Sequence, residues 1–171
     1  MYKIHEIAPD LFRISIFAPQ FNIQFNHFLI KDDEPLLYHA GLKGMFPLLH
    51  EAVKTLIEPK RIRWVGFSHY EVDECGALNE WLQVAPDAQA VCSTVGTIIN
   101  MSDFAIRPAK PLQHNEVLTT GKYSYRFMLA ELNPKTLATM HGSSFYGDCS
   151  KALLDLDGVM KDLWGDKKSN I

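Results

Sequence analysis

The chain has 171 residues, of which 47% are hydrophobic, so it is long enough and apolar enough to bury the core of a globular domain. Its formal net charge of −3, without a large cluster of Lys or Arg, excludes the basic surface that binds nucleic acid. Because the N-terminus has no apolar signal region and no apolar run is long enough to cross a bilayer, we expect a cytoplasmic protein with no membrane partner.

The expected elements alternate between strands and helices. Alternating apolar residues predict strands, and apolar residues at helical spacing predict amphipathic helices. In the first half these are strands over residues 2–7 and 11–17, a helix over 45–56 that Pro59 must end, a strand over 61–67 and a helix over 74–84. In the second half they are a strand over 89–93, a helix over 95–101, a loop over 107–111, strands over 117–118, 123–128 and 136–140, and a final helix over 149–164.

The three cysteines indicate neither a disulfide framework nor a thiolate metal site. Cys75, Cys92 and Cys149 are odd in number and share no C-x-x-C spacing. We expect them to be small buried residues.

Metal-competent side chains follow the apolar run that ends at Phe67. The chain there reads Ser68-His69-Tyr70-Glu71-Val72-Asp73-Glu74-Cys75-Gly76. In an extended segment, alternate residues point to the same side about 7 Å apart, so His69, Glu71 and Asp73 can converge on one or two ions as the chain bends out of the strand. One imidazole with two carboxylates suits iron, manganese or zinc and argues against an all-thiolate zinc cage.

A purely structural interpretation of the same residues is open. The following residues have helical spacing, so Asp73 could be the N-cap of a helix and Glu74 an acid that the helix dipole favours in the first turn. His69 could be a hydrogen-bonded histidine at a strand end. A short H-x-E-x-D pattern also occurs by chance.

The motif resembles the first metal motif of the metallo-β-lactamase superfamily, in the H-x-E-x-D form of its diiron branch, the flavodiiron and oxygen-binding diiron proteins. Asn26–Ile30 resembles the early strand of that fold. His39 stands where the family has the acid of an acid-x-Gly turn, and Pro134–Ser143 resembles the closing strand with its terminal His-Gly. The resemblance implies an α/β fold, the metallo-β-lactamase-like αββα sandwich, with two bound irons.

The resemblance also implies which residues bind those irons. Carried over residue by residue, His69 and Glu71 would bind the first iron, and Asp73 and His141 would bind the second. Family members carry a further His and a bridging Asp between the first motif and the last, and neither is present in this chain. We therefore expect incomplete metal occupancy unless another chain contributes ligands.

The missing ligands indicate that an internal segment is absent near Met128–Leu129. We expect a single domain over residues 1–171 with an incomplete second half, in which 1–128 form the N-terminal half with the first metal motif and 129–171 form the closing strand and final helix. Such a gap leaves sheet edges and apolar faces uncovered, among them the side of Tyr123, Tyr125 and Phe127, so we expect a homo-oligomer.

The function that the resemblance implies is non-haem diiron chemistry with dioxygen or nitric oxide. No flavodoxin-like domain follows, so FMN is not expected on this chain, and electrons would come from a separate redox partner. One alternative is a zinc metallohydrolase, although the hydrolases of the superfamily usually carry histidine at the position of Glu71. Another is a metal-poor, non-catalytic oligomeric scaffold. The catalytic residues stay unassigned.

Overall fold

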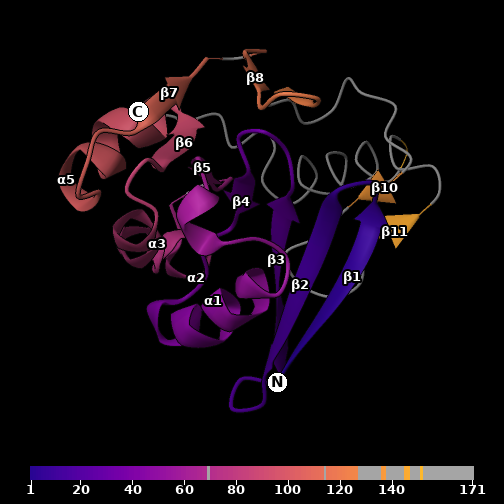
Figure 1. Cartoon of the computed structure of the whole chain (residues 1–171). Coiled ribbons are helices and arrows are strands. Elements are labelled where there is room, and N and C mark those ends of the chain that lie inside the picture. Colours follow the sequence, from indigo (N-terminus) through magenta and orange to yellow (C-terminus); the bar gives the residue numbers. More distant parts are fainter. Residues whose placement is uncertain (69, 114, 127–135, 138–144, 147–150, 152–171) are drawn as a thin grey trace. The chain divides into compact units, whose positions relative to one another are not determined.

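The structure is a computed structural model that describes residues 1–68, 70–113, 115–126, 136–137, 145–146 and 151 (Figure 1). The chain forms two compact units. The described residues up to Arg126 belong to the first unit, and the short strands at 136–137 and 145–146 belong to the second. Among the described residues, no helix is long and apolar enough to span a membrane.

A mixed sheet of seven strands, in the order β1-β2-β3-β4-β5-β6-β7, is the framework of the first unit (Figure 1). Neighbouring strands pair antiparallel from β1 to β4 and parallel from β4 to β7. The strands are β1 (Tyr2–Ala8), β2 (Leu11–Ala18), β3 (Ile23–Ile30), β4 (Leu36–Tyr38), β5 (Trp64–Gly66), β6 (Gln89–Ser93) and β7 (Lys110–Leu112). The predicted hairpin at the N-terminus is confirmed, with Ile4 opposite Ile14 and Asp10 at φ 62° in the turn.

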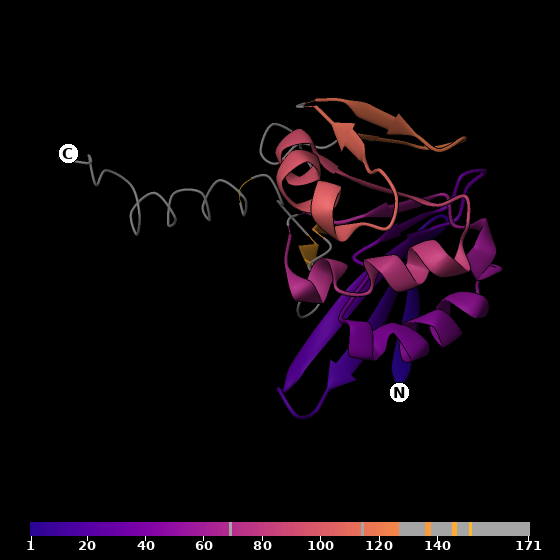
Figure 2. The ribbon, with the colours of Figure 1, turned by 90° about the vertical axis from the view of Figure 1, so that its left-hand side faces the viewer.

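Helices pack on one face of this sheet. They are α1 (Phe46–Lys54), α2 (Val72–Cys75), α3 (Leu78–Val84), α4 (Thr94–Gly96), the π-helix η3 (Thr97–Met101) and α5 (Ser102–Phe104), with 3₁₀ turns η1 (Lys43–Met45) and η2 (Pro59–Arg61). Figure 2 shows the purple α1 and the pink α3 together on one side of the sheet. Leu49 of α1 and Trp81 of α3 are fully buried in one hydrophobic core with Leu37 of β4.

The prediction of one continuous helix over 74–84 was wrong, and a tertiary hydrogen bond lies at the break. The structure has two helices, α2 and α3, separated at Gly76 and Ala77. The amide of Ala77 donates to the carbonyl of Gly41 over 2.8 Å, a contact between segments distant in sequence. The predicted start of the helix was also too late, since α2 begins at Val72.

Other boundaries differ for local reasons. The helix over 45–56 ends at Lys54, before Pro59, because the hydroxyl of Thr55 bonds back to the carbonyl of Ala52 over 2.7 Å. The strand over 61–67 is shortened to β5 by the 3₁₀ turn that begins at Pro59. The predicted loop over 107–111 ends in β7, which accepts a proline because it is the outer strand of the sheet.

A hairpin of β8 (Val117–Thr119) and β9 (Ser124–Arg126) forms a separate two-stranded sheet in the first unit. Leu118 is buried with Trp64 and Val91 in a second hydrophobic cluster, and Tyr123 and Tyr125 pack against it. The expectation that this side is uncovered was therefore wrong for the two tyrosines, and Phe127 lies outside the described residues. The hairpin protects the sheet face that the helices leave open.

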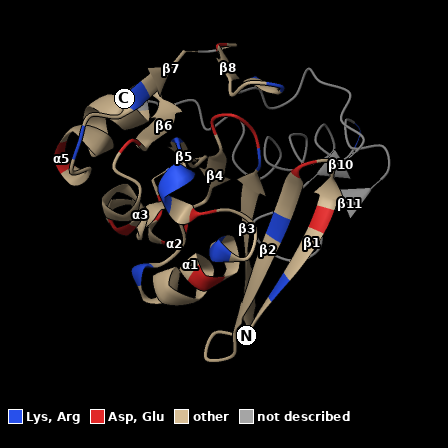
Figure 3. Ribbon diagram, in the orientation of Figure 1, with Lys and Arg blue, Asp and Glu red and all other residues tan. Residues whose placement is uncertain are grey.

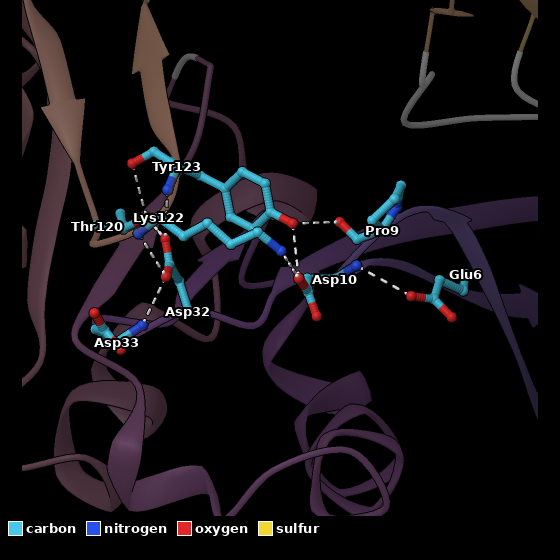
Figure 4. A network of polar contacts seen from close by, with 8 residues as sticks. All are labelled: Glu6, Pro9, Asp10, Asp32, Asp33, Thr120, Lys122 and Tyr123. Carbon is cyan, nitrogen blue, oxygen red and sulfur yellow. Dashed lines mark hydrogen bonds and ion pairs between the residues drawn. The ribbon is translucent and has the colours of Figure 1, made fainter.

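One carboxylate attaches this hairpin to the loop after β3. Asp32 accepts a hydrogen bond of 2.7 Å from the hydroxyl of Thr120, and its oxygens also accept the amides of Lys122 at 3.0 Å and Tyr123 at 2.9 Å (Figure 4). Asp10 binds Lys122 Nζ at 2.9 Å and the hydroxyl of Tyr123 at 2.7 Å. We call the contacts of Asp32 and Asp10 with Thr120, Lys122 and Tyr123 the hairpin clasp.

The second unit is described by two short strands. β10 (Thr136–Leu137) pairs antiparallel with β11 (Phe145–Tyr146). The predicted closing strand thus begins at Thr136 as expected, and residues 138–140 and nearly all of the predicted helix over 149–164 lie outside the described residues. Across the described ribbon, acidic and basic residues are interspersed (Figure 3).

Candidate metal centre

The metal motif follows a buried parallel strand and extends into the first turn of a short helix. β5 ends at Gly66, and the chain stays extended at Glu71, with φ −127° and ψ 146°, before α2 begins at Val72. Glu71 is exposed, and Asp73, in the first turn of α2, is partly buried. Of the four predicted ligands, the structure therefore describes these two carboxylates, while His69 and His141 lie outside the described residues.

The purely structural interpretation of the motif fails in one respect. The N-cap of α2 is Glu71 and not Asp73, and the Glu71 side chain makes no capping hydrogen bond. Asp73 and Glu74 do occupy the first turn, as that interpretation expected. Capping therefore does not account for the carboxylate of Glu71.

Glu74 is a site residue whose role sequence reasoning missed. Glu74 is 3% exposed, and its carboxylate accepts the backbone amide of Ser68 at 2.9 Å and the Ser68 hydroxyl at 2.7 Å. On its other side, Oε2 lies 3.5 Å from Nε2 of His39, which is also buried. Two features of the sequence could have indicated this role: Glu74 directly follows Asp73, and His39 stands where the family has an acid.

A second buried histidine supports the turn that contains His39. The Nδ1 atom of His27 lies 3.0 Å from the carbonyl oxygen of His39, so Nδ1–H is the donor. Burial lowers the pKa of His27 to about 4 and keeps the ring neutral at physiological pH. Gly41 packs against this ring at φ 84°, and a Cβ there would come within 2.7 Å of the His27 Cε1 atom, so no other residue fits.

An aromatic contact joins the motif to the segment after β6. Tyr70, between His69 and Glu71, makes an edge contact with Phe104 of α5 at a ring-centroid distance of 5.6 Å. The amide side chain of Asn79 donates to the Phe104 carbonyl at 2.9 Å and accepts the Ile106 amide at 3.0 Å. The helical segment 94–104 is thereby tied to the start of α3.

The thiol beside the motif is protected. Cys75 is 2% exposed, its Sγ–H donates to the Glu71 carbonyl at 3.0 Å, and burial raises its pKa to about 11. Cys92 is also a buried free thiol, as predicted. Cys149 lies outside the described residues.

The two described candidate ligands, Glu71 and Asp73, fit a hard or borderline cation such as iron. Carboxylate oxygens bind such cations better than they bind soft metals. Within the described ranges, no group of three or more His, Cys, Asp or Glu side chains is arranged to hold a metal ion. Both predicted histidine ligands lie outside those ranges, so the full ligand set stays a prediction.

A mixed sheet with helices on one face, and a carboxylate motif after strand β5, are features of a metallo-β-lactamase-like protein. The sequence matches the family described as "ODP family beta lactamase" over residues 23–142. The chain belongs to this family, in the flavodiiron branch of the metallo-β-lactamase superfamily.

Curated relatives match part of the chain. The flavo-diiron protein FprA2 of Clostridium acetobutylicum is 27% identical over 108 residues, which are 62% of this chain and 27% of that protein. The rubredoxin-oxygen oxidoreductase of Megalodesulfovibrio gigas is 25% identical over 105 residues, which are 60% of this chain and 26% of that protein. The chain thus spans about a quarter of the length of these relatives.

Solved structures show the fold. The putative diflavin flavoprotein A 5 fragment from Nostoc sp. superposes with a TM-score of 0.75 at 13% identity, covering 95% of this chain and 97% of that one. A flavoprotein from Thermotoga maritima gives 0.74 at 16% identity, covering 94% and 62%. These similarities confirm the α/β metallo-β-lactamase-like fold.

Proposed function

We propose that this chain is a non-haem diiron-type protein that binds or reduces dioxygen or nitric oxide. Glu71 is the observation that carries the proposal. Its carboxylate stands at the position where hydrolases of the superfamily usually carry histidine. Glu71 is exposed at the start of α2, and its side chain makes no capping hydrogen bond. An oxygen donor there favours iron over zinc.

His69 and Glu71 would hold one iron, and Asp73 and His141 the other. The carboxylates of Glu71 and Asp73 would balance part of the metal charge while leaving positions open. Iron bound there would supply electrons to a diatomic ligand. Tyr70 and Phe104 place aromatic surface next to the motif.

The source of electrons is part of the proposal. Reduction would use electrons from a redox partner, and one relative bears the name rubredoxin-oxygen oxidoreductase. Without such a partner the protein would bind or sense the diatomic molecule.

Metal analysis after anaerobic reconstitution tests the proposal. The protein is offered ferrous iron and Zn²⁺ in equal amounts, and bound metal is measured after desalting. We expect iron to be retained and a visible band to appear when air is admitted. Stoichiometric zinc without iron, or hydrolase turnover that a chelator abolishes, would instead support the zinc hydrolase.

A donor-exchange variant sharpens the test. Glu71→His replaces an oxygen donor by a nitrogen donor and should shift the preference towards zinc. Glu51→His is the matched control, because Glu51 is an exposed glutamate on α1 with a side chain 68% exposed. It should leave the metal preference unchanged.

A further inference from the structure

The loop from His39 to Gly41 is bonded to the chain on both sides of the metal motif. The His39 amide donates to the carbonyl of Gly66, the last residue of β5, at 2.8 Å. The Gly41 amide donates to the Glu74 carbonyl at 3.2 Å, and the Gly41 carbonyl accepts a hydrogen bond from the Ala77 amide at 2.8 Å. The strand before the motif and the helix after it are therefore held by the same three-residue loop.

The backbone of this loop is in an unfavourable conformation. His39 has φ 66°, in the left-handed region that non-glycine residues seldom adopt. Such conformations persist where surrounding contacts over-determine them, and they cluster at functional sites. Here the contacts are the hydrogen bond from His27 to the His39 carbonyl and the approach of His39 Nε2 to Glu74.

The carboxylate of Glu74 is buried, and its oxygens are engaged by another residue of the protein. Both of its oxygens lie within hydrogen-bond distance of Ser68, one residue before His69. Its helical neighbour Asp73 is only partly buried, whereas Glu74 is 3% exposed. Adjacent acids on one short helix thus have different surroundings.

We propose that Glu74, supported by His39, is a positioning residue for the metal centre: it holds Ser68 and so fixes the start of the His69-Tyr70-Glu71 segment, without binding metal itself. The inference rests on the proposed metal site. A buried carboxylate that accepts two hydrogen bonds from one residue restricts that residue's backbone, and groups that orient metal ligands typically contribute 10- to 100-fold in affinity.

Anaerobic titration with Co²⁺, a spectroscopic probe for the iron site, tests this role. In Glu74→Gln, which keeps the side-chain volume, we expect about tenfold weaker Co²⁺ binding and a shifted visible spectrum. Ser68→Ala should change both in the same direction, and Ser68→Thr, which keeps the hydroxyl, should behave as wild type. Glu80→Gln, on α3 and paired with Lys43 at 3.0 Å, is the control that should change neither.

The outcomes separate this inference from the proposed function. Wild-type affinity and spectrum in Glu74→Gln would overturn the positioning role alone. Weakened binding in Glu74→Gln with unchanged binding in Ser68→Ala would show that Glu74 acts other than through the Ser68 side chain, which also overturns the inference. A wild-type protein that binds no Co²⁺ or iron would overturn the metal site together with this inference. If circular dichroism shows that Glu74→Gln is unfolded, the comparison of Ser68→Ala with Ser68→Thr decides whether the positioning role holds.

Discussion

Asp32 accepts a hydrogen bond of 2.7 Å from the hydroxyl of Thr120, 88 positions later in the chain. This contact fastens the β8–β9 hairpin over the second hydrophobic cluster, which contains Trp64. Desolvation raises the pKa of Asp32, but hydrogen bonds from Thr120 and from backbone amides outweigh it and lower the pKa to about 2. The hairpin clasp therefore depends on the ionised carboxylate.

Asp32→Ala should loosen the hairpin. It removes the acceptor for the amides of Lys122 and Tyr123, so we expect hydrogen exchange in residues 117–126 to accelerate by about tenfold or more. Mass spectrometry of peptides measures this. Asp33→Ala, at the exposed neighbouring acid, is the control, and equal protection in both variants would contradict the role of Asp32. In wild type, the clasp should be intact above about pH 4 and weaken as pH falls towards 2.

Stability should decline in mild acid because of His27. Burial lowers its folded-state pKa from 6.5 to about 4, so between these values the unfolded chain binds more protons and the free energy of unfolding falls as pH falls. His27→Asn removes the titration and keeps a donor for the His39 carbonyl. Wild type should be the more stable protein at pH 6.5, and its advantage in free energy of unfolding over the variant should shrink by about 1.5 kcal/mol by pH 5.

Denaturant unfolding at several pH values measures that difference. His5→Asn is the control, because His5 is an exposed histidine on β1. A wild-type advantage that stays constant across this range would show that His27 does not titrate on unfolding.

Loss of predicted ligands should abolish tight metal binding. Glu71→Ala and His141→Ala should each weaken iron or Co²⁺ binding by more than about 100-fold, since each removes a direct donor. His5→Ala and Glu51→Ala are controls of the same residue types at exposed positions. Similar losses in all four variants, measured by metal titration, would place the site elsewhere.

The thiols near the motif should be unreactive in the folded protein. Burial raises the pKa of Cys75 to about 11 and raises that of Cys92, so thiolate is scarce at pH 8. In a Cys149→Ser background, a colorimetric thiol reagent should detect no rapidly reacting cysteine until denaturant is added, and then both. Rapid labelling of the native protein would mean that the segment around α2 opens.

Self-association is expected in solution. In the described part of the first unit, Ile98 and Ile99 are 66% and 68% exposed, and such neighbouring aliphatic side chains are often covered by another chain. Light scattering should give a mass above that of one chain. A double substitution of both residues by Lys should lower it, whereas Val117→Lys, at another exposed aliphatic residue, should not.

Combining that measurement with iron counting tests the incomplete ligand set. The number of irons bound per chain should rise as the chains associate, if a second subunit contributes metal ligands. A stable monomer with two tightly bound irons would contradict both expectations.

Local pattern was sufficient for much of this protein. The hairpin of β1 and β2, the strand β6 and the helix α1 follow from apolar spacing between near neighbours. The H-x-E-x-D motif is equally local, since its members lie within five consecutive residues, and family membership follows from it and the matching strands.

Contacts between distant segments decided the rest. Whether Glu74 is a ligand, a helix-dipole acid or a clamp depends on Ser68 and on His39 from another strand end, which spacing along α2 does not contain. The break before α3 depends on the carbonyl of Gly41. A buried polar group takes its role from whichever partner replaces its water, and only the folded chain brings that partner close.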